Sequence, residues 1–251
     1  AVCTRLSEVE EGFHAGAAGL ALTAEEILMR RKMWLGALGL AAVLVAGGLF
    51  ASNMGFKLNY TLDGPGTNGS ATGTSSLALP YNPQTNLTNA EDLINDVNAS
   101  AGSSVVGNVA RWVKATDGLA VYTGTAGVNF SLTPGDGYLV KVGATASYIV
   151  VGSHAPTMGI TLDGPGSNGS ATGTTLWAYP YHSTVAIAGD LITEIDTAAG
   201  SSVVANVARW VKGSDGLEVY TGSSGVNFAL TPGEGYWIKV GSTVTWVPSH
   251  Y

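Results

Sequence analysis

The residues that could carry acid–base or nucleophilic chemistry are few in this chain. No histidine falls in a pattern with Ser and Asp that indicates a catalytic triad, and no G-x-S-x-G motif is present. Histidines at repeat ends and after strands are more often polar loop residues than catalytic ones. We therefore predict no catalytic histidine among the four in the chain, which are His14, His154, His182 and His250.

The carboxylates could in principle form the acid–base pair of a glycosidase. Most of them, however, precede a glycine or fall in an expected helix, where turn and capping roles explain them. They also recur in pairs 98 residues apart, and a duplicated catalytic site would have to be used twice. We therefore expect no enzyme and no catalytic residue. The paired positions are Asp92 and Asp190, Asp117 and Asp215, and Asp136 and Glu234.

A glycine-rich segment at residues 63–70 (DGPGTNGS) offers oxygen atoms that a calcium ion could use. Its spacing lacks the D-x-[DN]-x-[DN]-G pattern and the distal Glu of a calcium loop. It is no phosphate-binding loop either, because no Lys follows and no helix begins there. We expect a plain turn, with no metal site and no cofactor.

The composition narrows the class of protein. The chain has 251 residues and a net charge of −7, and only 12% of its residues are charged, about half the usual share. Phosphate binding needs clustered Lys and Arg, so nucleic acid is not an expected partner. The single cysteine, Cys3, lies in a segment that we expect to be absent from the mature protein, which would then have no disulfide.

The first fifty residues indicate export. Residues 29–52 combine a basic start, an apolar run and a small-residue exit, which predicts a signal peptide. Residues 1–28 are then a mis-called start or an extension. Two alternatives stay open: the apolar run is retained as a membrane anchor, or it is a pilin-type signal. In the favoured interpretation the mature protein is extracellular or at the cell surface, and it meets the membrane only during export.

An internal duplication is the strongest feature of the sequence. Residues 61–74 recur as 161–174 with one change, and residues 101–143 align without a gap to 199–241, with 33 of 43 positions identical. We therefore predict two domains, a first β repeat at 53–154 and a second at 155–251, joined by a linker too short to keep them apart.

Each repeat has the pattern of a mainly β domain with one short helix. We expect two tandem repeats that resemble a β-sandwich or a small barrel. In the first repeat the helix spans 90–97, with Thr88 and Glu91 at capping-box spacing. The expected strands are 54–62, 77–81, 105–114, 119–122, 130–132, 138–142 and 147–151.

These landmarks resemble a tandem β-rich module that is widespread in bacterial and archaeal secreted and cell-surface proteins. The similarity rests on an "LP" strand, a short acidic helix, an "RW" strand and an "LTPGxGY" hairpin. The first copy has them at residues 77–81, 90–94, 110–113 and 132–138, and the second at 176–181, 190–192, 209–210 and 230–236. The resemblance implies a non-catalytic extracellular building block without a defined ligand.

Two sets of residues are candidates for contacts with partners. The N-terminal strand of the first repeat could pair with a sheet edge of another chain, or within its own repeat; its candidate residues are Met54, Phe56, Leu58 and Tyr60. Aromatic side chains that the second repeat replaces or adds could form an exposed sugar-stacking platform or a subunit contact; these are Trp177, Trp237 and Trp246. At Trp112, Trp210, Tyr138 and Tyr236 we expect core packing.

The sequence thus predicts a structural subunit of an extracellular filament, pilus-like fibre or surface layer. Copies of the chain would be its main partner, joined by contacts between strands or sheet edges. The alternative is a secreted adhesin or carbohydrate-binding module with glycans as partners.

Overall fold

The computed structural model describes residues 55–83, 87–153, 158–181 and 183–249, all within one unit of the chain, 51–251. The predicted signal segment, Met54 and the histidines therefore lie outside the described residues. In the described part no helix is both long and apolar enough to cross a membrane.

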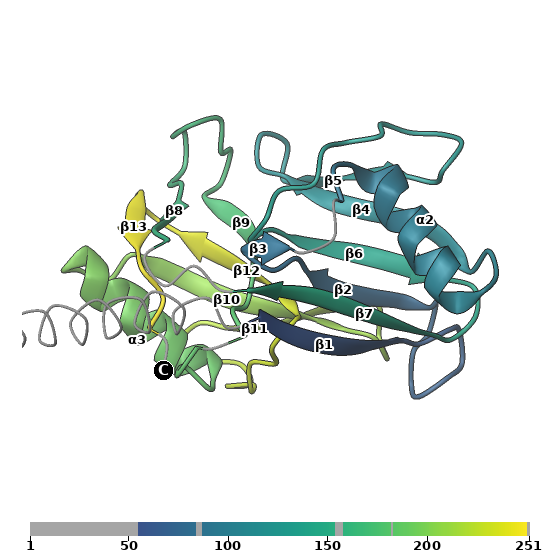
Figure 1. The fold of residues 1–251 in the computed structure, drawn as a ribbon. Helices are drawn as coiled ribbons and strands as arrows, with labels where there is room; N and C mark the ends of the chain where they lie inside the picture. Colours follow the sequence, from purple (N-terminus) through teal and green to yellow (C-terminus); the bar gives the residue numbers. More distant parts are fainter. Residues whose placement is uncertain (1–54, 84–86, 154–157, 182, 250–251) are drawn as a thin grey trace, which may run out of the picture. The chain divides into compact units, whose positions relative to one another are not determined.

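The first repeat consists of two antiparallel sheets and a helix (Figure 1). The larger sheet has the strand order β2-β6-β4-β5, and the smaller one has the order β1-β7-β3. Helix α2 contacts β4 of the larger sheet and β7 of the smaller one. The elements are β1 (Gly55–Leu62), β2 (Thr74–Ala78), β3 (Asn82–Pro83), α2 (Ala90–Ala101), β4 (Val106–Val113), β5 (Gly118–Tyr122), β6 (Gly137–Val142) and β7 (Ala146–Ser153).

The second repeat has the same plan with a reduced second sheet. Its larger sheet has the order β11-β10-β12-β9, and its smaller sheet is the pair β13-β8. The elements are β8 (Ile160–Leu162), β9 (Thr174–Ala178), α3 (Ala188–Ala199), β10 (Val204–Val211), β11 (Gly216–Tyr220), β12 (Gly235–Val240) and β13 (Val244–Trp246). The chain is thus mainly β, as predicted, and its antiparallel sheets are open rather than closed into barrels.

Helix α2 forms because its apolar residues recur on one face. Ala90, Leu93, Ile94 and Val97 are buried, at the i, i+3, i+4, i+7 spacing of an amphipathic helix. The predicted capping box is displaced by one residue, however. The N-cap is Asn89, whose side chain accepts a hydrogen bond from the backbone N–H of Asp92 at position N3, and the Asp92 side chain accepts one from the backbone N–H of Asn89. The prediction that Thr88 and Glu91 form the capping box is therefore wrong.

Each repeat buries its own apolar core between its two sheets and its helix. Strand β7 illustrates the cause, since its residues alternate between buried and exposed over Ala146–Val151 as a half-buried strand requires. One predicted strand is absent: residues 130–132 make a single bridge, at Ser131 to Asn89, because this segment crosses to the helix instead of joining a sheet.

Candidate functional site: the contact between the repeats

The two repeats share a third apolar cluster, which lies between their larger sheets. Its buried members are Ala110 and Leu139 from the first repeat and Leu176, Ala208 and Trp237 from the second, and Trp112 and Trp210 pack against it. The main sheet-to-sheet contacts join β2, β4 and β6 to β9 and β12. Each larger sheet therefore has one face in the core of its own repeat and the other face partly covered by the other repeat.

One pair of hydrogen bonds across this contact is reciprocal, with the same bond made once in each direction. Trp112 donates from Nε1 to the carbonyl oxygen of Thr174 at 3.0 Å, and Trp210 donates to Thr74 at 3.1 Å. Because 112 corresponds to 210 and 74 to 174, each repeat gives the other the same bond. Such reciprocity is the property of an isologous, twofold interface. The covalent tandem thus packs like a homodimer of one repeat.

Two ion pairs repeat the same symmetry. Lys114 Nζ lies 2.9 Å from Asp163 Oδ2, and Lys212 Nζ lies 2.9 Å from Asp63 Oδ2. Burial opposes the ionisation of Asp63, but hydrogen bonds from Lys212 and Asn68 outweigh it, so the pKa of Asp63 is lowered. The pKa of Asp163 is lowered in the same way, by Asn168 and Lys114 against burial.

These contacts account for the glycine-rich segment at 63–70. Asp63 accepts from Asn68 through one oxygen and from Lys212 through the other, so the loop carries a bridge between repeats. Among the described residues no group of three or more His, Cys, Asp or Glu is placed to hold a metal ion. The role of Lys114 and Lys212 was not predicted from the sequence. The signal was available: both are duplicated in a chain with only 11 basic residues.

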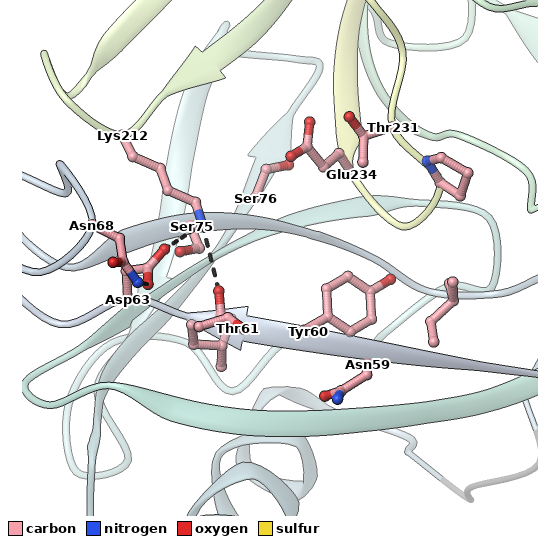
Figure 2. A pocket seen from close by; sticks show the side chains of 13 residues that line it. Asn59, Tyr60, Thr61, Asp63, Asn68, Ser75, Ser76, Lys212, Thr231 and Glu234 are labelled. Atoms are coloured by element: carbon pink, nitrogen blue, oxygen red, sulfur yellow. Dashed lines mark hydrogen bonds and ion pairs between the residues drawn. The ribbon is translucent and has the colours of Figure 1, made fainter.

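A pocket opens beside each of these contacts, and the two pockets differ in size: one has a volume of about 320 Å³ and the other about 190 Å³. The larger one, here called the β1 pocket, lies between β1 and the hairpin that carries Thr231 and Glu234 (Figure 2). The Lys212–Asp63 pair lies at one end of it. The equivalent pocket in the other half has about 190 Å³ and is lined by Lys114, Asp136 and Thr175 among others. Burial raises the pKa of Asp136, and the nearby Lys114 offsets part of that increase.

The predicted assembly strand is β1, and it pairs with β7 of the same repeat along its whole length, from Gly55 with Ser153 to Leu62 with Ala146. Phe56 is largely buried and stacks on Tyr181 of the second repeat with the ring centroids 4.5 Å apart. Leu58 and Tyr60 line the β1 pocket. The structure thus has the intrachain pairing that the sequence left open, and pairing of β1 between chains stays a prediction.

The three tryptophans expected on the surface are buried, so the prediction of an exposed aromatic platform is wrong. Trp177 and Trp246 lie in the core of the second repeat with their centroids 5.0 Å apart. Trp246 takes the place of Tyr148 and donates to Glu194, where Tyr148 donates to Asp96. Trp237 lies in the contact between the repeats. The exchange for larger rings compensates for the smaller second sheet of this repeat. Tyr138 and Tyr236 are buried, as predicted.

Part of the exposed apolar surface lies instead on the outermost strands of the larger sheets. Strands β5 and β11 end their sheets, and neither takes part in the main sheet-to-sheet contacts. Leu119 and Val121 of β5 are 45% and 40% exposed, and Leu217 and Val219 of β11 are 48% and 39% exposed. The sequence signal for this surface is the alternation of apolar residues in GLAVY (118–122) and GLEVY (216–220), which were predicted only as strand residues.

The comparisons with known proteins return no relative: no family model matches the chain, and no curated protein or solved structure does.

Proposed function

We propose that this protein is a structural subunit of an extracellular filament, pilus-like fibre or surface layer, in which copies join through the outer edges β5 and β11. The observation that carries the proposal is the continuity of each exposed strip with the contact between the repeats. Leu119 lies directly opposite Trp112 in the ladder, and Val121 lies opposite Ala110. Residues opposite one another project from the same face of a sheet.

The covered part of this face indicates what would cover the rest. Ala110 and Trp112 pack against an equivalent repeat of the same chain, and β5 extends the same apolar face beyond that contact. The same holds in the second repeat, where Leu217 lies opposite Trp210. The covered part of this face already packs against a copy of the module. We therefore expect a second copy of the module to cover the exposed part, on β5 and β11.

Charges near the two edges favour contact between unlike edges. Arg209 pairs with Glu218 of β11 at 2.7 Å. In the first repeat the corresponding Arg111 lies opposite Ala120, and no described carboxylate forms an ion pair with it. The two edges therefore differ in charge, since β11 carries a carboxylate at the position where β5 carries Ala120. Edge β5 of one copy with β11 of the next is a heterologous contact, which produces an open chain of subunits unless it closes into a ring.

The extracellular location rests on the sequence: the predicted signal peptide, the low share of charged residues, and the resemblance to secreted β modules. The alternative function as a carbohydrate-binding module loses its original support, because the aromatic residues that suggested it are buried.

The test compares the sizes of assemblies formed by the purified protein and by the double variant Leu119→Asp/Leu217→Asp. Buried carboxylates at an apolar contact are costly, so the variant is expected to be monomeric by sedimentation while the unmodified protein forms polymers that are visible by negative-stain electron microscopy. Val247→Asp is the matched control, since Val247 is 49% exposed and lies outside both edges. A monomeric unmodified protein at all concentrations would refute the proposal.

A further inference from the structure

The β1 pocket contains a buried hydroxyl group that has no hydrogen-bond partner among the described residues. Ser75 lies on β2, lines the pocket and is 2% exposed, yet its Oγ has no partner. The equivalent Thr175 lines the smaller pocket, and its Oγ1 is also without a partner. Buried polar groups are nearly always paired, so each exception calls for an explanation such as a bound water or ligand.

The charges around the β1 pocket restrict the kind of ligand. Lys212 and Glu234 line it together with Asp63. Lys212 and Asp63 pair with each other, which leaves the Glu234 carboxylate as the charge that a ligand would meet. An anion would be repelled by this carboxylate, whereas a neutral ligand can donate a hydrogen bond to it without bringing a charge of its own into a space of about 320 Å³.

The remaining groups offer both hydrogen bonds and an aromatic wall. Glu234 accepts from the Tyr236 hydroxyl through Oε2, which leaves Oε1 to accept from a ligand. Thr231 and Ser75 add hydroxyl groups, which both donate and accept. The side chain of Tyr60 lies between β1 and Glu234 (Figure 2), and its hydroxyl donates to the carbonyl oxygen of Ala78. Burial and the nearby Glu234 raise the pKa of Tyr60, so its phenol stays neutral.

The two pockets differ mainly in the strand beside them. Strand β1 contributes Leu58 and Tyr60 to the larger pocket, whereas β8 is only three residues long and the smaller pocket has no lining residue from it. The larger volume lies at the lower end of the range for small-molecule sites, about 300–1,000 Å³, and the smaller one lies below it.

We propose that the β1 pocket binds a single neutral sugar residue, with Ser75 and Glu234 as its hydrogen-bonding groups and the Tyr60 ring as its wall. A sugar carries several hydroxyl groups that donate and accept at once, which suits a pocket with Oε1 of Glu234 as an acceptor and the Ser75 hydroxyl as either. The free monosaccharide and the terminal residue of a glycan share this chemistry.

The experiment titrates the purified full chain with glucose, galactose, mannose and N-acetylglucosamine, using saturation-transfer NMR and calorimetry. Glucuronic acid and glucosamine serve as charged comparators. At least one neutral sugar is expected to bind, and Ser75→Ala and Glu234→Gln should each weaken that binding by about tenfold. Thr175→Ala, which removes the equivalent hydroxyl in the smaller pocket, should leave it unaltered. Binding of galacturonic acid is then compared with binding of its methyl ester. The two have the same ring and differ in charge, so only the neutral ester is expected to bind.

Three results would overturn the proposal. The first is no binding of any of the four neutral sugars, which would mean that water alone fills the pocket. The second is binding that Ser75→Ala and Glu234→Gln leave intact, and the third is tighter binding of a charged sugar. The titration is repeated in the Leu119→Asp/Leu217→Asp variant, so that loss of assembly and loss of sugar binding are separated.

Discussion

Gly137 and Gly235 lie back to back where the two larger sheets meet, and a Cβ atom added to either would come within 3.0 Å of the other's Cα. The two glycines occupy the same position in their repeats, each at the start of the strand that follows the LTPGxG hairpin. They therefore mark the pseudo-twofold relation between the repeats, and a side chain at either position would meet both the other glycine's backbone and the Leu176 side chain.

Replacement of either glycine should weaken the contact between the repeats. Gly137→Ala forces a methyl group against the Gly235 backbone and Leu176, so we expect a loss of about 1–3 kcal/mol in the free energy of unfolding. Urea denaturation measures it. Gly107→Ala is the control, because position 107 is open to a Cβ and the second repeat already carries Ala205 there. Equal stability of the two variants would contradict the close approach.

The Lys212–Asp63 ion pair should stabilise the contact measurably. The Asp63 side chain is 7% exposed and the Lys212 side chain 33%, so Lys212→Met leaves a nearly buried carboxylate without its partner. We expect a cost of about 1–2 kcal/mol, below that of a fully buried pair because water reaches the ammonium. In a double-mutant cycle with Asp63→Asn, the double variant should lose less than the sum of the single variants. Additive losses would show that the two groups are not coupled.

The loss of stability at acid pH should come in part from protonation of Asp63 and Asp163. Their pKa values are lowered in the folded protein, so their stabilisation is present above the unfolded value of about 3.9 and is lost as pH falls through the folded value. Asp63→Asn/Asp163→Asn should therefore flatten the fall in melting temperature below about pH 4. An unchanged loss of stability at acid pH in this variant would contradict the assignment.

Asp136 should have the opposite effect. Burial raises its pKa in the folded protein, so its contribution is favourable at low pH and is lost as pH rises through that raised value. Asp136→Asn removes the charge and keeps an oxygen acceptor, and it should increase the free energy of unfolding at pH 7 but not at pH 3. The same variant at the two pH values is its own control, and a decrease at pH 7 would refute the prediction.

Local features of the fold could be predicted from the sequence. The helix at Ala90–Ala101 follows from its apolar spacing, and the strands β4, β5 and β6 from alternation and turn glycines. The predicted N-cap was one residue away from the observed one because Thr88 and Asn89 are both residue types that cap helices. The Asp92 side chain accepts hydrogen bonds from the backbone N–H groups of both residues, and this places the cap at Asn89.

The contact between the repeats could not be predicted in the same way. Trp237 and Ala110 look like ordinary strand residues in the sequence, and only the packing of the two sheets puts them on one apolar face. Trp177 and Trp246 were placed on the surface because they are additions to the second repeat; they are buried because β8 and β13 are short and leave space for larger rings.

Contact between β5 of one copy and β11 of the next is tested most directly by mixing two single-edge variants, Leu119→Asp and Leu217→Asp. The mass of the complexes is measured by sedimentation. If β5 of one copy meets β11 of the next, each variant keeps one working edge. Each should then be monomeric alone, and an equimolar mixture should form dimers that grow no further. Polymers in either variant alone, or no association in the mixture, would contradict the account.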